Sequence, residues 1–269
     1  MSSRASRRQA ERARREVFWG ALAFFAAIAI AGGAAWAWYE RPSTTLDAAL
    51  CPAGGPRGHF VLLVDKTDPL TFTQKQAFQV RLRELIEKRT PQGYLLSVFV
   101  LGESFRDNAK PLVELCNPGD GSDRSALTAN LAHLRRQYEE RFIAPLMAEA
   151  DALQAATPAK TSPIFEMLQL VGINAFQSHG VKGERRLIVM SDMLQNTTQF
   201  SMYRGATDFD AFARSDYGRK VQAQLPGVEV ELDVLVNTPA LQTRRNLKFW
   251  EDWFDRAGAR IVRVDPLEG

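Results

Sequence analysis

The stretch FVLLVDKTDPL, residues Phe60–Leu70, constrains the fold of this chain more than any other part of the sequence. Its first five residues are all apolar, and such a short run without a polar break is typical of a strand buried on both faces of a parallel sheet. Asp65, Thr67 and Asp68 follow where such a strand ends, and open α/β sheets bind their ligands at the carboxyl ends of their strands. The loop after this strand is therefore the best candidate site in the chain.

The rest of the sequence alternates between predicted strands and predicted helices. The strands are predicted at Phe60–Val64, Tyr94–Leu101, Pro111–Leu115, Arg186–Ser191, Val228–Val236 and Arg260–Val264. The helices are predicted at Thr71–Arg89, Ser125–Ala156 with a bend at Pro145, Ile164–Gln177, Asp208–Leu225 and Ala240–Ala257. Because most connections are long enough to hold a helix, this pattern predicts an α/β fold, a mostly parallel sheet covered by helices on both faces. The short strand Pro111–Leu115 is expected to pair antiparallel at a sheet edge.

The last predicted helix carries an aromatic cluster, Phe249, Trp250, Trp253 and Phe254. Trp250 and Phe254 share one helical face with Leu247, so we expect this face to pack in the core. A docking patch for a partner is the alternative interpretation.

An apolar run without charges covers Val17–Tyr39 and is long enough to cross roughly 30 Å of hydrocarbon as one helix. Aromatic residues flank it, with Trp19 at one end and Trp36 and Trp38 at the other, as is common at membrane interfaces. A cleaved signal peptide is the alternative. The run is longer than the apolar region of most signals, however, and aromatic residues replace a small-residue cleavage site at its end. We therefore predict a retained transmembrane helix.

The basic residues are concentrated before this run. Residues 1–16 hold six arginines and two glutamates, a net charge of +4 in a chain whose formal net charge is +3. The remainder is close to neutral, which gives no reason to expect nucleic acid binding. Segments rich in arginine stay in the cytoplasm. We therefore predict a basic cytoplasmic tail at 1–16, the transmembrane helix at 17–39, a linker at 40–58 and an exported domain at 59–269. In a bacterium this means an inner-membrane anchor and a periplasmic domain.

The chain contains two cysteines, Cys51 in the predicted linker and Cys116 after the strand Pro111–Leu115. In an oxidising compartment they are expected to form a disulfide that closes a loop of roughly 65 residues. Two unrelated buried thiols are the alternative.

Three predicted loops should meet at the carboxyl edge of the sheet, namely Asp65–Pro69, Thr161-Ser162 and the loop that begins at Asp192. Carboxylates and hydroxyls, without sulfur or a nearby histidine, suit a hard cation. The sequence therefore predicts a site for Mg²⁺, or for Ca²⁺ or Mn²⁺, with ligands among Asp65, Thr67, Asp68, Thr161, Ser162 and Asp192.

At these residues the sequence resembles the von Willebrand factor A family, over roughly residues 59–266. The metal-ion-dependent adhesion site of that family takes an Asp-x-Ser-x-Ser loop after the first strand, a Thr from a later loop and an Asp after the fourth strand. The resemblance aligns Asp65, Thr67 and Asp192 with the first Asp, the first Ser and the last Asp, and Thr161 or Ser162 with the Thr. It implies a three-layer, Rossmann-like domain that binds a protein partner, whose carboxylate completes the coordination of the metal ion.

The sequence departs from the family pattern at two positions. Pro69 stands where the second Ser is expected, so one hydroxyl is missing unless Asp68 or water replaces it. Residues 191–193 read Ser-Asp-Met in place of Thr-Asp-Gly. An alternative interpretation needs no metal: Asp65 begins a turn and an N-cap before the next helix, and Asp192 caps a turn in the same way.

Other kinds of site have less support. His59, His133 and His179 are scattered, and none has a Cys or a carboxylate at metal-ligand spacing, so each is expected to be structural or exposed. The sequence has no Gly-x-Ser-x-Gly, Walker-type or Gly-x-Gly-x-x-Gly motif. Asp65–Asp68 also differs from the Asp-x-Asp of haloacid-type phosphatases.

Together these features favour a membrane-anchored protein-interaction domain over an enzyme. Two alternatives are kept. One is a metal-dependent hydrolase that activates water with the same carboxylates. The other is a metal-free structural component of an envelope complex, in which the transmembrane helix and the region Ser125–Ala156 make the contacts.

Overall fold

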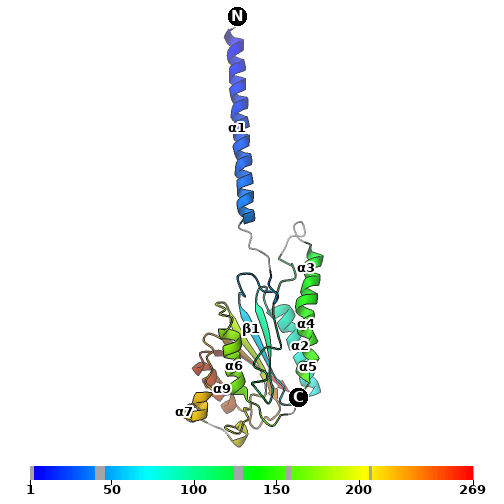
Figure 1. The fold of residues 1–269 in the computed structure, drawn as a ribbon, viewed down its shortest axis with the longest axis vertical. Coiled ribbons are helices and arrows are strands. Elements are labelled where there is room, and N and C mark those ends of the chain that lie inside the picture. Colours follow the sequence, from blue (N-terminus) through cyan, green and yellow to red (C-terminus); the bar gives the residue numbers. More distant parts are fainter. Residues whose placement is uncertain (1–2, 40–45, 124–129, 156–158, 206–207, 269) are drawn as a thin grey trace. The chain divides into compact units, whose positions relative to one another are not determined.

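The computed structural model describes residues 3–39, 46–123, 130–155, 159–205 and 208–268 of the chain. The chain divides into two compact units, residues 1–44 and 45–269 (Figure 1). The first unit consists of one helix, α1 (Ser3–Tyr39), which covers the predicted span and most of the arginine-rich segment before it. The backbone of the predicted tail therefore continues into the span without a break.

Within α1, the stretch Phe18–Trp36 is long and apolar enough to cross a membrane, with a mean hydropathy of 1.9. None of this stretch is buried against other parts of the described chain. Phe24, Phe25 and Ile30, for example, are all largely exposed. The length and the composition of this helix agree with the predicted transmembrane span.

The second unit is built on a six-stranded sheet with the strand order β3-β2-β1-β4-β5-β6. The strands are β1 (His59–Asp65), β2 (Leu95–Leu101), β3 (Val113–Cys116), β4 (Arg185–Ser191), β5 (Glu229–Val236) and β6 (Arg260–Glu268). All neighbouring pairs are parallel except β2 and β3, which are antiparallel. The predicted α/β fold with a short antiparallel edge strand is therefore confirmed.

Strand β1 lies in the middle of the sheet between β2 and β4. Every residue of β1 is buried, which explains why its sequence has no polar residue between His59 and Asp65. Asp65 pairs with Leu101 at the end of β2, and Val64 pairs with Met190 one residue before the end of β4. The carboxyl ends of β1 and β4 thus meet at one edge of the sheet.

Helices cover both faces of the sheet (Figure 1). One face packs against α2 (Phe72–Glu84), η1 (Leu85–Arg89), α3 (Leu131–Tyr138), η2 (Glu139–Ile143), α4 (Ala144–Ala148) and α5 (Ala150–Gln154). The other face packs against α6 (Ile164–Val171), η3 (Gly172–Gln177), α7 (Phe209–Arg214), α8 (Asp216–Lys220) and α9 (Arg244–Arg256), with the 3₁₀ turn η4 (Met202–Arg204) at its margin. Each face has its own apolar core, so the domain has three layers.

The aromatic cluster of α9 lies in one of these cores. Phe249, Trp250, Trp253 and Phe254 are all buried. The ring centroid of Phe165 in α6 lies 4.8 Å from that of Trp250. The prediction that these aromatic residues pack in the core is confirmed.

The helices are less regular than the sequence predicts. The predicted helices Thr71–Arg89 and Ile164–Gln177 each end in a π-helical turn, η1 and η3. A third π-helical turn, η2, lies before Pro145, whose ring and missing N–H disturb the preceding helical turn. Residues 125–129 and 156 of the predicted helical region Ser125–Ala156 lie outside the described residues. The predicted helix Asp208–Leu225 is interrupted at Ser215, which is extended and caps α8 by accepting a hydrogen bond from Gly218.

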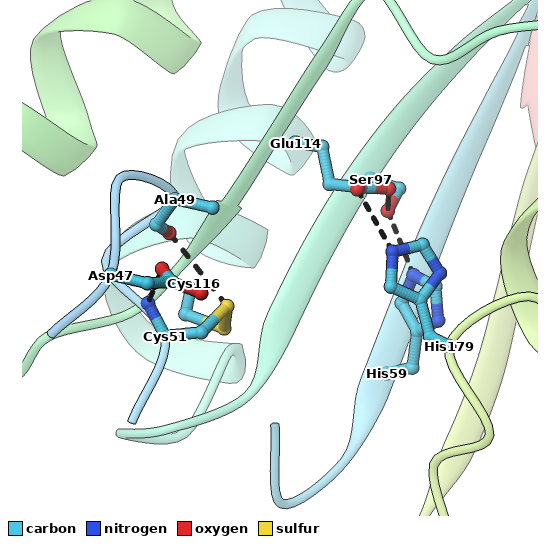
Figure 2. The surroundings of a disulfide bond; sticks show 8 residues. All are labelled: Asp47, Ala49, Cys51, His59, Ser97, Glu114, Cys116 and His179. Carbon is cyan, nitrogen blue, oxygen red and sulfur yellow. Dashed lines mark hydrogen bonds and ion pairs between the residues drawn. A yellow bond between two sulfur atoms is a disulfide. The ribbon is translucent and has the colours of Figure 1, made fainter. Parts of the chain in front are cut away.

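Cys51 and Cys116 form a disulfide (Figure 2). It joins the N-terminal segment of the domain, residues 46–58, to the end of β3. The backbone N–H of Cys116 also donates to the carbonyl of Ala49 at 2.8 Å, and the N–H of Cys51 donates to Asp47 Oδ1 at 2.8 Å. The predicted pairing is present, and this part of the predicted linker packs on the domain, with Leu50 and Cys51 buried. Residues 40–45 of the linker lie outside the described residues.

Candidate functional site

Three loops meet at the carboxyl edge of the sheet, beside the ends of β1 and β4. They carry Asp65 and Thr67 after β1, Ser162 before α6 and Asp192 after β4, and all four side chains are buried. Ser162 is held against the loop after β4 by two backbone hydrogen bonds with Asn196, with N to O distances of 2.7 and 3.0 Å. The fold therefore brings together residues that are far apart in the sequence.

The Asp65 carboxylate accepts hydrogen bonds from all three segments. Its Oδ1 accepts from the backbone N–H of Thr67 at 3.0 Å and from the Thr67 hydroxyl at 2.6 Å. Its Oδ2 accepts from the hydroxyl of Ser191 at 2.6 Å and from that of Ser162 at 3.5 Å. Because one carboxylate binds hydroxyls from three segments, Asp65 fixes their positions relative to one another.

Asp192 has fewer donors around it. Its Oδ1 accepts from the backbone N–H of Leu194 at 2.8 Å, and its Oδ2 accepts from the Tyr203 hydroxyl at 3.4 Å. Tyr203 belongs to η4 and is 46% exposed, so its ring borders the site at the surface. The backbone of Asp192 is held from another side, because Gln242 Nε2 donates to its carbonyl at 2.9 Å.

Met193, the next residue, has a φ of 57°, which L-residues rarely adopt. The family pattern has Gly here, and Gly adopts this conformation without a steric penalty. In this chain the conformation is held by contacts: Met193 is buried, its N–H donates to Ser191 Oγ at 3.0 Å, and its carbonyl accepts from Trp250 Nε1 at 2.8 Å. The loop after β4 therefore keeps a glycine-type turn although the glycine is replaced.

Burial affects the protonation of both carboxyl groups. It raises the pKa of Asp65 above its ordinary value, although hydrogen bonds from Ser191 and Thr67 oppose this shift. Burial, together with the neighbouring carboxylate of Asp65, raises the pKa of Asp192 to about 8. Asp68 acts in the same direction on both groups. The two aspartates thus form a buried pair of carboxyl groups in which ionisation of one disfavours ionisation of the other.

The candidate ligand atoms are the carboxylate oxygens of Asp65 and Asp192 and the hydroxyl oxygens of Thr67 and Ser162. Oxygen atoms of these kinds are the ligands that hard cations prefer. A divalent ion beside them would favour the ionised carboxylates and so offset their mutual repulsion. In the described part of the chain, no group of three or more His, Cys, Asp or Glu side chains is arranged to hold a metal ion. An ion at this site would therefore depend on the hydroxyls and on water as well as on the two carboxylates.

Two of the predicted ligands lie at the margin of this cluster. The Thr161 hydroxyl donates to the carbonyl of Glu103 at 3.5 Å, whereas the Ser162 hydroxyl donates to Asp65, so the fold brings Ser162 to the site. Asp68 is half-buried at the rim, next to the exposed Pro69. Pro69 contributes no side-chain oxygen at the position where the family has its second Ser.

The turns predicted by the metal-free interpretation are also present. Asp65 and Asp192 each accept a hydrogen bond from the backbone N–H two residues later. The N-cap of α2 is Thr71, whose hydroxyl accepts from the N–H of Gln74 at 3.2 Å while the Gln74 side chain accepts from the N–H of Thr71 at 3.0 Å. The cap of this helix is therefore formed by Thr71 and Gln74, and neither aspartate takes part in it.

Sequence reasoning did not identify Ser191, Tyr203 and Gln242 as part of this cluster. Ser191 had a usable signal, because the last residue of β4 must lie beside the end of β1 once the two strands are parallel neighbours. Tyr203 and Gln242 lie in irregular segments, and no periodic pattern predicts where such residues are placed.

A second polar cluster lies at the opposite, amino edge of the sheet (Figure 2). Ser97 Oγ lies 2.7 Å from His59 Nε2 and donates to Glu114 at 2.7 Å, and His179 Nε2 lies 3.0 Å from the other oxygen of Glu114. His59 and His179 are far apart in the sequence but their ring centroids are 5.2 Å apart in the fold, because the segment after η3 returns to the start of β1. Burial, with a smaller contribution from His179, lowers the pKa of His59 to about 3. This ring therefore stays neutral and contributes to the structure.

Many solved structures are similar to this chain, and two of them show the degree of likeness. The crystal structure of the SpRpn10 VWA domain is 10% identical in sequence, with a TM-score of 0.38, and the match covers 79% of this chain and 88% of that one. The crystal structure of an aerotolerance-related membrane protein from Bacteroides fragilis NCTC 9343, with multiple mutations to serines, is 11% identical with a TM-score of 0.37. That match covers 78% of this chain and 92% of the other. No family model and no curated protein matches the sequence.

The strand order, the antiparallel edge strand β3 and the helices on both faces agree with the arrangement that the sequence resemblance implies. The position of the Asp65 loop at the carboxyl edge, beside the end of β4, agrees with it as well. The chain therefore has a von Willebrand factor A-like domain, preceded by one helix that is long and apolar enough to span a membrane.

Proposed function

We propose that this chain is a membrane-anchored protein-interaction module whose von Willebrand factor A-like domain binds a protein partner at the carboxyl edge of its sheet. A divalent cation such as Mg²⁺, held by Asp65, Thr67, Ser162 and Asp192, would take part in this contact. The observation that carries the proposal is the convergence of two buried carboxylates and two hydroxyls from separate loops at one edge of the domain. When bound, the ion would compensate the buried negative charge and accept a carboxylate oxygen of the partner.

The way the chain enters the domain supports this proposal. The N-terminal segment is bonded through Cys51 to Cys116, which pairs with Leu95 at the start of β2. The candidate site lies at the opposite end of the parallel strands, about 7 residues or roughly 23 Å away. The disulfide-bonded segment therefore lies away from the candidate site within the domain.

The rim of the site is also suited to a protein contact. Phe72, the first residue of α2, is 74% exposed, and Tyr203 and Pro69 are exposed beside the buried aspartates. Exposed aromatic side chains around a polar centre are typical of protein interfaces, where they supply most of the buried apolar area.

We further place the domain in the periplasm, on an anchor in the bacterial inner membrane with its N-terminus in the cytoplasm. The six arginines before the apolar helix favour this orientation. The buried disulfide is in keeping with an oxidising compartment, where such bonds persist.

The partner-binding edge can be tested by photo-crosslinking in intact cells. A photoreactive amino acid replaces Phe72, at the candidate site, or Lys182, an exposed residue just before β4 at the opposite edge. We expect a covalent adduct of defined mass from position 72 and none from position 182, because only the carboxyl edge is buried by the partner. Asp192→Asn, which keeps the shape of the side chain and removes its charge, is expected to abolish the adduct from position 72.

The same experiment separates the alternatives. Adducts at position 182 alone, or at neither position, would contradict the proposed edge. An adduct at position 72 that survives both Asp192→Asn and chelation would favour the metal-free structural role. One observation supports that second candidate, since the Asp65 carboxylate already accepts four hydrogen bonds within the protein.

A further inference from the structure

Two apolar hollows lie on either side of the first turn of α9, close to the candidate site. The first has a volume of about 270 Å³ and is lined mainly by Phe200, Met202, Leu241 and Phe249. The second has a volume of about 260 Å³ and is lined mainly by Val234, Leu247, Trp250 and Val264. Each volume is several times the roughly 30 Å³ that one water molecule occupies in the liquid, which is enough for one large apolar side chain.

Both hollows open at the same edge of the domain as the candidate site. Helix α9 follows β5, so its N-terminus lies at the carboxyl end of that strand. Gln242, just before the helix, donates to the carbonyl of Asp192. Asn246, which borders both hollows, contacts the sulfur of Met202 at 3.2 Å, and Met202 precedes Tyr203. A partner bound over Asp192 would therefore also cover the first turn of α9.

The N-terminus of α9 has an unusual charge distribution for a helix of 13 residues. Its first turn holds two arginines, Arg244 and Arg245, and no acidic residue, and its N-cap Thr243 makes no side-chain hydrogen bond to the helix. The free N–H groups and the helix dipole already make this end positive, so arginines here are unfavourable unless an anion approaches. Both arginines are exposed, and within the described residues neither forms an ion pair. Arg245 borders the first hollow and Arg244 borders the second.

The neighbouring groove between α7 and α9 differs in character. Its volume is about 770 Å³, and its lining combines four aspartates with Arg245, Lys248 and Arg256. Charges of both signs are present there, whereas the charged residues among the described lining of the two hollows are all arginines. The hollows and the first turn of α9 thus form a surface that is complementary to an acidic, apolar ligand.

We infer that this surface, which we call the α9 surface, binds a partner segment in which an Asp or Glu lies between two large apolar residues. The apolar side chains enter the two hollows, and the carboxylate lies against Arg244, Arg245 and the free N–H groups of α9. This inference rests on the proposed function, because it describes the partner that the same edge would bind. The contacts of the α9 surface are separate from the buried aspartates. This inference can therefore fail while the proposed function holds.

The test uses the full chain in lipid nanodiscs and a blocked peptide, acetyl-Gly-Xaa-Glu-Leu-Gly-amide, in which Xaa is 4-fluorophenylalanine. Binding is followed by the broadening of the peptide ¹⁹F resonance as protein is added. A second peptide carries Gln in place of Glu. We expect the Glu peptide to bind about three- to tenfold more tightly than the Gln peptide, because the carboxylate meets two arginines that form no ion pair with any described residue.

Three variants locate the contact. Leu241→Trp fills the first hollow and is expected to abolish binding, whereas Arg244→Gln combined with Arg245→Gln is expected to remove the preference for Glu. Lys248→Gln, a change on an exposed lysine of the same helix, is the matched control and should leave binding unchanged. Equal binding of both peptides by the wild type, no binding of either, or full binding by Leu241→Trp would overturn the inference.

One further comparison separates this inference from the proposed function. Peptide binding by the wild type is compared with the crosslink at position 72, because the two readouts can differ. If the peptide binds as expected while the crosslink at position 72 is absent, the α9 surface exists and the proposed binding edge fails. If Leu241→Trp leaves the crosslink intact, the partner does not use this surface and the inference is overturned.

Discussion

Asp65 and Asp192 lie next to each other but differ in how their negative charges are compensated. Asp65 accepts hydrogen bonds from three hydroxyls and one backbone N–H. Asp192 accepts one from a backbone N–H and a long one from Tyr203. Hydrogen bonds to an ionised carboxylate favour its ionisation. Because Asp192 accepts fewer of them, it keeps its proton more readily than Asp65 does.

This difference predicts a pH dependence of stability. In the unfolded chain the pKa of Asp192 is close to 3.8, whereas in the folded domain burial and Asp65 raise it to about 8. Between these values the folded state holds a proton that the unfolded state has released, so the free energy of unfolding decreases as the pH rises. We expect urea unfolding in the presence of a chelator to show a decrease on the order of 1–2 kcal/mol between about pH 6.5 and about pH 8, a range above most of the titration of His59 in the unfolded chain.

Two comparisons isolate the contribution of Asp192. Asp192→Asn should remove most of the pH dependence, whereas Asp151→Asn, at an exposed carboxylate of α5, should leave it unchanged. Adding Mg²⁺ or Mn²⁺ should flatten the wild-type curve, because a bound cation keeps the carboxylates ionised. Identical curves for the wild type and Asp192→Asn would show that this pair does not control the titration.

For single residues, the sequence predicts the positions of those that lie at the beginning or the end of a regular element. Asp65, Thr67 and Asp192 could be identified because they directly follow apolar strands, and parallel strands place their carboxyl ends at one edge. The choice between Thr161 and Ser162 could not be made, because it depends on the backbone pairing of Ser162 with Asn196. The contact of Tyr203 with Asp192 depends in the same way on the path of an irregular loop.

The observed strands agree with their predicted residue ranges more closely than the observed helices do. Strand β5 shows why: it alternates acidic residues, Glu229, Glu231 and Asp233, with apolar ones, so one of its faces must be polar. On that face the buried Glu231 is paired with Arg89, Arg186 and Arg263. The alternation is visible in the sequence, but the arginines come from three different elements, and no local pattern identifies them as partners.

The helices differ from their predicted ranges where local geometry departs from a regular α-helix. The π-helical turns η1, η2 and η3 keep the spacing of apolar residues approximately helical, so periodicity cannot detect them. The break at Ser215 is recognisable only from its capping hydrogen bond with Gly218. The number of layers could therefore be predicted, whereas the ends of the helices could not.

The disulfide is the covalent link between the N-terminal segment of the domain and the edge strand β3. β3 has only four paired residues with its single neighbour β2, so few backbone contacts hold it in place. The bond closes a loop with a sequence separation of 65, and the reduced entropy of the unfolded chain predicts a stabilisation of about 4 kcal/mol. We expect Cys51→Ser combined with Cys116→Ser to lower the free energy of unfolding by about this amount, measured by urea unfolding and tryptophan fluorescence.

The control for this double variant is wild-type protein unfolded in a reducing agent. The two should show the same midpoint, because both lack the covalent loop in the unfolded state. A change of less than about 1 kcal/mol in the double variant would mean that residues 46–58 and β3 are held by non-covalent contacts alone.

At the scale of the whole molecule, the two units have separate roles in the proposed function. The first unit is one helix, in which an arginine-rich segment precedes an exposed apolar stretch. The second unit has two apolar cores, one on each face of its sheet. Within the second unit, the disulfide lies near the amino edge of the sheet, and the candidate site and the α9 surface lie at the carboxyl edge. Within the domain, the disulfide and the residues proposed to bind a partner therefore lie at opposite edges of the sheet.

The disulfide also provides a test of the orientation of the whole chain in the membrane. If the arginines keep the N-terminus in the cytoplasm, the domain is exported and Cys51 and Cys116 are oxidised. We expect denatured wild-type protein, taken from cells quenched with acid, to react with a thiol reagent only after reduction.

Replacing the six arginines by glutamine and adding three lysines after Tyr39 should invert the orientation and keep the domain in the cytoplasm. Both thiols should then react without reduction. Free thiols in the wild type, or an oxidised pair in the inverted variant, would contradict the proposed orientation.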